Sequence, residues 1–144
     1  MEPGRSIVAD AGITLYTVGS VKQIKGYKYY ISVDGGMTDN PRFALYGAKY
    51  TVINATHADS EPDMIADIVG RCCESGDIIQ KNVSIKRPVR GEKIAVLVTG
   101  AYNYSMSGNY NRLPRPAVVM IRPDGSYSVV VRRESFEDLI KNDI

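Results

Sequence analysis

The stretch AVVMIRPDGSYSVVVRRES, residues 117–135, contains two runs of β-branched and aromatic residues on either side of a turn. Runs such as AVVMI and YSVVV are typical of strands, because branched and aromatic side chains suit a pleated, half-buried surface. Between them, Pro123, Asp124 and Gly125 supply turn chemistry, since proline fixes its own φ and glycine accepts a positive one. The stretch therefore predicts a β-hairpin.

Strand-like runs of the same kind recur along the chain, as YKYYISVD at 27–34, YTVINA at 50–55 and KIAVLVTGAY at 93–102. Turn signals separate them and no long helical periodicity interrupts them. This pattern indicates a mainly β domain, an antiparallel sandwich or barrel. We expect Thr14–Ile31 and Ile94–Val131 to supply much of the sheet.

We also expect a few short helices, and the clearest helix signals lie at the end of the chain. Ser135 can cap a helix, Asp138 stands at capping-box spacing, and Lys141 falls in the last turn. We therefore expect a short helix near Ser135–Asn142.

The composition is that of one ordinary globular domain. A chain of 144 residues can bury a real core and is too short for two ordinary domains, so we assign residues 1–144 to a single domain. The net charge is +2 with acids and bases interspersed, so nothing favours binding to nucleic acid or a membrane. Apolar runs such as Ala117–Ile121 are too short to span a bilayer. Two adjacent cysteines cannot join distant loops, which excludes a disulfide scaffold and indicates a reducing cytoplasm.

The first residues, MEPGRSIV, place a Pro-Gly turn directly before a strand-like run. A domain seldom begins in a turn of this kind, so we expect the chain to be part of a longer protein. The segment EPGR itself has two interpretations. It is either a plain solvated turn or an anion cradle, in which Gly4 lets the backbone approach a phosphate and Arg5 offers a planar fork of donors.

Both cysteines lie side by side in RCCESGDIIQKN, residues 71–82, and Glu74 follows them at once. A metal site has little support, because zinc requires ligands at spacings such as C-x-x-C and the lone His57 stands in a loop. Adjacent strand residues face opposite ways, so one cysteine can be core while the other faces out. ESGD is typical of a turn, which would leave Cys73 at a strand end. There a thiol and a carboxylate suit proton transfer or amine binding, and an inert buried cysteine is the alternative.

Two further motifs combine polar and aromatic residues. In PRFALYG, residues 41–47, Arg42 and Tyr46 stand four apart, on one face of a helical turn. GAYNYSMSGNYNRLPRP, residues 100–116, is by itself consistent with a polar, aromatic surface loop.

Four motifs occur in one order along the chain, namely EPGRSIVADAG (2–12), YISVDGGMTDNPRFALYGA (30–48), GRCCESGDII (70–79) and VTGAYNYSMSGNYNRLPRPAVVMI (98–121). So arranged, they resemble the carboxy-terminal part of the diaminopimelate decarboxylase family. That family is in the alanine-racemase-like class of pyridoxal-phosphate enzymes and is related to ornithine and arginine decarboxylases. The resemblance covers essentially the whole chain. It is specific, because ornithine-type relatives carry an aspartate where this chain has Glu74.

The resemblance implies a two-domain enzyme, in which an amino-terminal TIM-like barrel, absent from this chain, precedes a carboxy-terminal β domain. Residues 1–10 would be the last part of that barrel or the junction to it. Without the barrel we expect Glu2–Arg5 to be poorly supported.

The resemblance also implies a role for each matching residue. Glu2 would pair with the pyridine nitrogen of pyridoxal phosphate, Gly4 would present backbone to its phosphate, and Tyr102 would touch cofactor and substrate. Cys73 matches the proton donor, and Glu74 would bind the distal ammonium of the substrate. The carboxylate at the non-reacting end of the substrate would be held by Arg5, Arg42 and Tyr46.

The implied reaction is the decarboxylation of meso-diaminopimelate to L-lysine, in lysine biosynthesis. The implied assembly is a homodimer in which Cys73 and Glu74 reach the partner subunit's site. The Schiff-base lysine belongs to the absent barrel, so we expect the isolated chain to be inactive. Cys72 is an additional cysteine without an assigned role, and no metal is expected. Two alternatives remain open: a decarboxylase of a related diamino acid, and a stand-alone, non-catalytic β domain that binds or dimerises.

Overall fold

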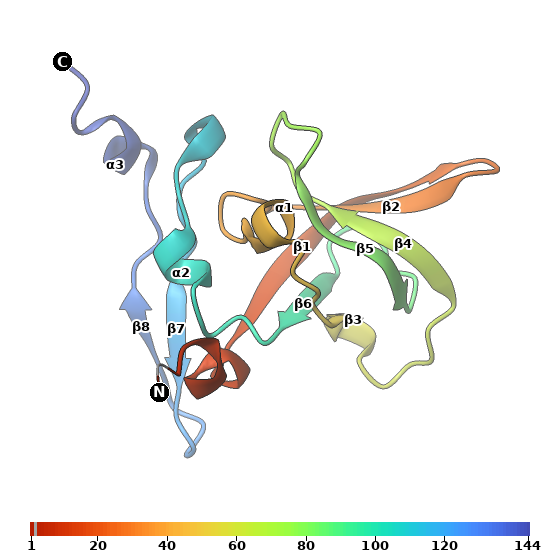
Figure 1. The fold of residues 1–144 in the computed structure, drawn as a ribbon, viewed down its shortest axis with the longest axis horizontal. Coiled ribbons are helices and arrows are strands. Elements are labelled where there is room, and N and C mark those ends of the chain that lie inside the picture. The colour runs from red at the N-terminus through yellow and green to blue at the C-terminus, as the bar shows by residue number, and fades with distance from the viewer. Residues whose placement is uncertain (2) are drawn as a thin grey trace.

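The computed structural model describes residue 1 and residues 3–144, and within them the strands form a six-stranded sheet and a separate two-stranded one (Figure 1). The strands of the larger sheet are β1 (Ile13–Ile24), β2 (Lys28–Val33), β3 (Val52–Asn54), β4 (Met64–Val69), β5 (Ile78–Ile85) and β6 (Lys93–Leu97). Their spatial order is β3-β6-β1-β2-β4-β5. Among these described strands, neighbours run antiparallel except β2 and β4, which are parallel. Since β3 at one edge contacts β5 at the other, the sheet curls into a nearly closed barrel. The expected mainly β fold is confirmed, in its barrel form.

The curvature of the barrel begins in β1. Its first half, residues 13–17, pairs with β6, and its second half, from Val18 onward, pairs with β2. The register shifts between Val18 and Ser20, at Gly19. An extra residue at such a bulge bends the strand and increases its twist, which lets one strand serve two neighbours around a closed sheet.

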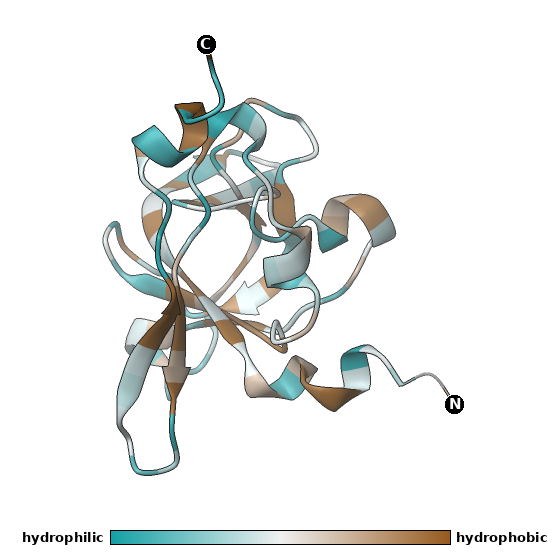
Figure 2. Ribbon diagram, turned by 90° about the vertical axis from the view of Figure 1, so that its left-hand side faces the viewer, coloured by the Kyte–Doolittle hydropathy of each residue, from teal (hydrophilic) through white to brown (hydrophobic). Residues whose placement is uncertain are grey.

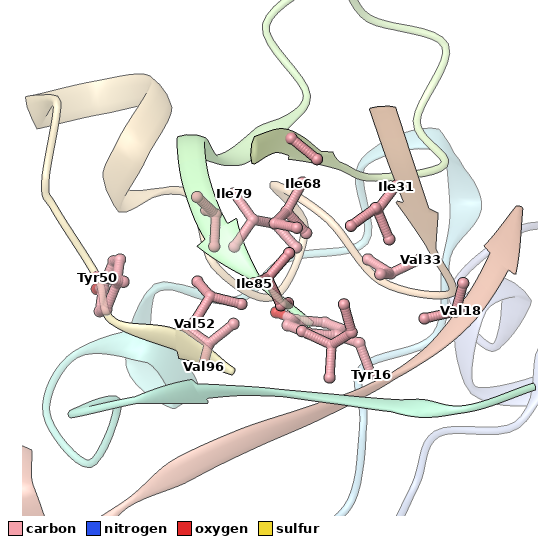
Figure 3. Close-up of a cluster of buried hydrophobic side chains, with 13 residues drawn as sticks. Tyr16, Val18, Ile31, Val33, Tyr50, Val52, Ile68, Ile79, Ile85 and Val96 are labelled. Atoms are coloured by element: carbon pink, nitrogen blue, oxygen red, sulfur yellow. The ribbon is translucent and has the colours of Figure 1, made fainter. Parts of the chain in front are cut away.

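Apolar side chains from every strand of the barrel fill its interior (Figure 3). Along β2, Ile31 and Val33 are buried while Ser32 between them is half-buried, as the alternation of a strand requires. Each fully buried large aliphatic side chain contributes about 1.5–3 kcal/mol relative to an exposed one. This interior is therefore the main support of the loops that the barrel carries. Its members are Tyr16, Val18, Ile31, Val33, Tyr50, Val52, Ala66, Ile68, Ile79, Val83, Ile85, Ile94 and Val96.

The second sheet is the hairpin expected from residues 117–135, formed by β7 (Val118–Ile121) and β8 (Tyr127–Val131). Gly125 in its turn has φ +81°, and the Asp124 carboxylate accepts a hydrogen bond from the backbone N–H of Ser126 at 2.9 Å. The range Ile94–Val131, expected to supply much of the sheet, is divided between the two sheets. β6 alone enters the barrel, because the residues after it leave the sheet in an irregular segment and the hairpin pairs only with itself.

Hydrophobic residues run along both strands of this hairpin, and it projects from the barrel (Figure 2). A two-stranded sheet is only marginally stable in water on its own, so its apolar surface is a candidate contact surface. The apolar side chains exposed on it are Val119, Met120, Ile121, Tyr127, Val129 and Val130.

The helices are all short. They are α1 (Arg42–Tyr46), α2 (Asn103–Met106) and α3 (Phe136–Ile140), with 3-10 turns at Arg5–Ile7, Ala9–Ala11, Ala55–His57 and Tyr110–Arg112. The helix expected near the end of the chain is confirmed as α3, with Ser135 and Asp138 forming a reciprocal capping box. No helix in the described part of the chain is long and apolar enough to cross a membrane.

Candidate active site

Arg42 lies between two tyrosine rings that come from different parts of the chain. Its guanidinium carbon is 5.3 Å from the centre of the Tyr46 ring and 5.3 Å from that of Tyr102. The first contact confirms that Arg42 and Tyr46 share one face of a helical turn. Arg42 Nε is buried without a hydrogen-bond partner, and Nη1 meets only the Met106 sulfur, at 3.8 Å. A guanidinium held by rings in this way keeps its N–H donors for a forked anion.

Gly4 brings the amino-terminal segment against Tyr102. A Cβ at position 4 would lie 2.5 Å from the Tyr102 hydroxyl oxygen, so a larger residue here would displace the Tyr102 side chain. We call Gly4, Arg42, Tyr46 and Tyr102 the arginine–tyrosine cluster. It joins four of the residues that the resemblance assigned to the site. Glu2 lies outside the described residues.

Arg5 follows Gly4 in the chain and is hydrogen-bonded to the carbonyl of Val98. Its Nη2 donates to that oxygen at 2.7 Å, and its guanidinium carbon is 5.6 Å from the Tyr50 ring centre. The expectation that this part of the chain is poorly supported is therefore wrong for Arg5, because Val98 and Tyr50 hold it. Arg5 Nε is buried without a hydrogen-bond partner, as is Arg42 Nε.

The segment between β6 and α2 has a strained backbone. Val98 has φ +62° and Tyr102 has φ +70°, a left-handed conformation that is unusual for tyrosine and an outlier for β-branched valine. Such strain costs about 1–3 kcal/mol per residue and collects at functional sites. Here it presents the Val98 carbonyl to Arg5 and the Tyr102 ring to Arg42.

The loop before α1 is fixed from inside the barrel. The buried Tyr16 hydroxyl donates to the Asp39 carboxylate, which also accepts the backbone N–H of Gly36 at 3.0 Å. Burial, followed by the charge and hydrogen bond of Asp39, holds the pKa of Tyr16 well above its usual value. Burial also raises the pKa of Asp39, against the opposing effect of the Tyr16 hydroxyl. This pair anchors the loop that delivers Arg42.

The two cysteines lie in a bend, residues 70–77, between β4 and β5 rather than at the end of a strand. Cys72 is half-buried and Cys73 is exposed, so neither cysteine is part of the core. Burial, and then the nearby Asp77 carboxylate, raises the pKa of the Cys72 thiol to about 11, which makes it a poor nucleophile and proton donor. ESGD forms the expected turn, with the Asp77 N–H donating to the Glu74 carbonyl at 3.1 Å. We call residues 72–77 the cysteine bend.

The side chain of Asp77 holds the cysteine bend by hydrogen bonds to backbone N–H groups. Its buried carboxylate accepts the backbone N–H groups of Cys72 at 2.6 Å and Met37 at 2.7 Å. A Cβ at Gly36 or Gly70 would come within 2.5 Å of the Asp77 carboxylate, so both positions need glycine for this close approach. Sequence reasoning noticed Asp77 only as part of a turn. Its role depends on a loop forty positions away, which no local pattern signals.

Cys73 and Glu74 are contacted by the turn at Tyr110–Arg112, which sequence reasoning also missed. Cys73 N–H donates to Asn111 Oδ1 at 3.2 Å, and the Tyr110 hydroxyl donates to Glu74 Oε2 at 3.3 Å. Cys73 and Glu74 remain exposed. Within the described residues, no hydrogen bond or ion pair joins them to Arg5, Arg42, Tyr46 or Tyr102.

The chain therefore presents two chemical groupings, a half-buried guanidinium between exposed tyrosine rings at the arginine–tyrosine cluster and an exposed thiol with a carboxylate at the cysteine bend. In the part of the chain that the structure describes, no group of three or more His, Cys, Asp and Glu side chains gathers as a metal site.

Comparison with known proteins places this arrangement in a family. A family model described as the C-terminal sheet domain of pyridoxal-dependent decarboxylases matches residues 6–100. Diaminopimelate decarboxylase from Bacillus subtilis is 50% identical over 144 residues, which cover all of this chain and 33% of that protein. The enzyme of the same name from Staphylococcus aureus is 47% identical, with 99% of this chain and 34% of that protein covered.

Solved structures of the same family match this chain as well. The crystal structure of diaminopimelate decarboxylase from M. jannaschii in complex with L-lysine matches with a TM-score of 0.89 at 34% identity, over 99% of this chain and 32% of that one. The chain thus spans about a third of the length of the relatives it matches. The resemblance stated from the motifs is confirmed, and the chain belongs to the family of C-terminal sheet domains of pyridoxal-dependent decarboxylases.

Proposed function

We propose that this chain is the carboxy-terminal domain of a pyridoxal-phosphate-dependent diaminopimelate decarboxylase, which removes carbon dioxide from meso-diaminopimelate and leaves L-lysine. One observation carries the proposal. Cys73 and Glu74 stand together on an exposed bend, and within the described residues no hydrogen bond engages the Cys73 thiol and no ion pair neutralises the Glu74 carboxylate. The relatives that bear this name, over the full length of the chain, support the assignment.

The residues present fit pyridoxal phosphate. Gly4 is exposed and has no Cβ beside the Tyr102 hydroxyl, so its backbone and that hydroxyl would hold the cofactor. Glu2 keeps its sequence-based role as partner of the pyridine nitrogen. When bound, the cofactor supplies an electron sink for the electron pair that remains when carbon dioxide leaves.

The arginine–tyrosine cluster is suited to one end of the substrate. The buried Nε of Arg42 and the buried Nε of Arg5 have no hydrogen-bond partner, and a carboxylate is the ligand that a planar guanidinium binds best. Arg42 and Arg5, with the Tyr46 hydroxyl, would therefore neutralise the carboxylate of the non-reacting end.

The cysteine bend is suited to binding the distal ammonium of the substrate and to delivering a proton. Glu74 would bind the distal ammonium, since Tyr110 donates to only one of its two carboxylate oxygens. Cys73 Sγ would deliver a proton to the substrate carbon that has lost carbon dioxide, a step that a positioned acid accelerates about 10²–10⁴-fold. The exposed Cys73 fits this role better than Cys72, whose thiol is held protonated.

The two groupings would meet across a homodimer, with the cysteine bend of one subunit completing the site of the other. We propose a cytoplasmic location, because two free cysteines suit a reducing compartment. The exposed apolar hairpin β7–β8 supports contact with a further part of the protein. Within the described residues, no hydrogen bond or ion pair brings a lysine to either grouping, so we expect the chain alone to be inactive.

A mixed-dimer experiment in the full-length enzyme tests this division. Arg42→Ala should weaken substrate binding by about 2–5 kcal/mol, because a desolvated carboxylate loses its partner. Cys73→Ala should mainly lower turnover. Each homodimer is impaired at both sites, whereas a mixed dimer of the two variants contains one intact site. Complete subunit exchange should therefore restore roughly a quarter of wild-type activity.

The matched control pairs Cys73→Ala with Glu74→Gln. Both changes lie on the cysteine bend, so a mixed dimer has one defect in each site and activity should stay low. Native mass spectrometry verifies exchange in both mixtures. Full exchange without recovery in the first mixture would show that Cys73 and Arg42 act within one subunit.

A further inference from the structure

We propose that Asn111 and Tyr110 are positioning residues for the cysteine bend, Asn111 for the Cys73 thiol and Tyr110 for the Glu74 carboxylate. This inference rests on the proposed function and deepens it. It gives a specific task to the motif GAYNYSMSGNYNRLPRP, which by its sequence alone is consistent with a surface loop.

The backbone of this turn is shaped to reach the bend. Asn111 and Arg112 follow each other with φ +57° and +55°, two successive left-handed residues. Asparagine tolerates this conformation, but arginine adopts it at a cost. The turn and the cysteine bend lie at the same end of the molecule (Figure 1). There the Asn111 amide oxygen accepts the Cys73 N–H at 3.2 Å and the Tyr110 hydroxyl donates to Glu74 at 3.3 Å.

The carboxy-terminal segment holds the strained turn in place. Glu134 accepts hydrogen bonds from Asn109 Nδ2 at 2.6 Å and from Arg115 N–H at 2.8 Å, so it ties both sides of the turn together. Arg112 Nη1 donates to Asp143 at 3.0 Å and to the Leu139 carbonyl at 3.3 Å. The turn is therefore a fixed support from which two side chains reach the bend.

The two contacts act on different parts of the bend. Asn111 holds the backbone N–H of Cys73, which sets the direction of its Cα–Cβ bond and hence the position of the thiol. Tyr110 holds one oxygen of Glu74, which orients the other toward a ligand. Loss of Asn111 should therefore impair proton delivery, and loss of Tyr110 should impair substrate binding. Simple packing between two loops predicts no such difference, because loosening the bend would disturb both groups together.

Single substitutions in the full-length decarboxylase test this distinction. Asn111→Gly removes the amide oxygen and permits the left-handed backbone. We expect kcat to fall about 10-fold with KM within about 2-fold, because the hydrogen bond that fixes the backbone carrying the Cys73 thiol is lost. Tyr110→Phe removes only the hydroxyl. We expect it to raise KM about 3–10-fold with kcat nearly unchanged.

The chain offers a matched control for each variant. Asn82 also has a left-handed backbone, at φ +53°, and its N–H rather than its side chain bonds Asp67, so Asn82→Gly tests the same exchange away from the site. Tyr27 is exposed, and its hydroxyl makes no hydrogen bond to the described residues, so Tyr27→Phe is the control for Tyr110→Phe. Neither control should change kcat or KM by more than about 2-fold.

Amide hydrogen exchange on this chain separates failure of this inference from failure of the proposed function. Asn111→Gly should speed exchange of the Cys73 N–H, and Asn82→Gly should not. A full-length protein without decarboxylase activity overturns the proposed function, whatever the exchange shows. An active enzyme in which Asn111→Gly and Tyr110→Phe behave like their controls, or lower kcat and raise KM alike, overturns the positioning role. Unchanged Cys73 exchange in Asn111→Gly also overturns it.

Discussion

The buried carboxylate of Asp77 provides a direct test of how the cysteine bend is held. Asp77 is 4% exposed, and its carboxylate accepts the N–H groups of Cys72 and Met37 at 2.6 and 2.7 Å. Asp77→Ala leaves both donors without this partner, and each such loss costs about 1–3 kcal/mol when no water replaces the acceptor. We expect the free energy of unfolding to fall by about 2–5 kcal/mol, a large share of the stability of a small domain.

Urea unfolding of this chain, followed by circular dichroism, measures the loss. Asp77→Asn keeps one acceptor oxygen and should give an intermediate value. Asp59→Ala is the matched control, because Asp59 is exposed and its side chain has no hydrogen-bond partner among the described residues. It should change stability by less than about 0.5 kcal/mol. A loss below about 1 kcal/mol for Asp77→Ala, with an unchanged urea dependence, would refute the anchoring role.

Two further predictions concern the titration of half-buried groups. Tyr16→Phe removes the donor to the half-buried Asp39 carboxylate and should destabilise the fold by about 1.5–3 kcal/mol at neutral pH. The Tyr16 hydroxyl stabilises the ionised form of Asp39, whose pKa in the folded state is already raised. The loss of unfolding free energy in Tyr16→Phe should therefore shrink as the pH falls from 7 toward about 4, because Asp39 becomes protonated. Urea unfolding at several pH values checks this, and a deficit independent of pH would contradict it. In a Cys73→Ser variant, Cys72 should react with iodoacetamide about 100-fold more slowly at pH 8 than an ordinary thiol, since its pKa is about 11 and the thiolate is the reactive form. Its rate should still rise above pH 10, whereas a plateau near pH 9 would show an ordinary thiol.

Local chemistry allowed parts of the fold to be predicted from the sequence. The Pro123–Gly125 turn, the capping box at Ser135 and the four-residue spacing of Arg42 and Tyr46 each act within a few residues, and each is confirmed. The separation of β7–β8 from the barrel could not be predicted in this way. Strand pairing depends on partners far away in the chain, and two adjacent β-rich runs look alike whether they join one sheet or two.

The residues that hold the candidate site in place could not be predicted from the sequence either. Cys73, Glu74 and Arg42 stand in motifs with recognisable chemistry. The residues that hold them, Asp77 and Asn111, do so through hydrogen bonds to backbone N–H groups about forty positions away. Such a contact leaves no local spacing to read, because any backbone N–H can be the donor. An asparagine followed by a second left-handed residue becomes visible only in the structure.

Within the described residues, Arg42 and Glu74 have no ion-pair partner. Several other charges form ion pairs, as between Lys28 and Asp67 at 2.9 Å and between Arg115 and Glu134 at 3.1 Å. Within the described residues, Arg42 instead contacts two neutral rings and Glu74 contacts a neutral hydroxyl. An ion pair would cancel each charge, whereas neutral partners fix the group and leave its charge for a ligand. A ligand end that carries both a carboxylate and an ammonium would satisfy both groups, which is the charge pattern proposed for the non-reacting end of the substrate.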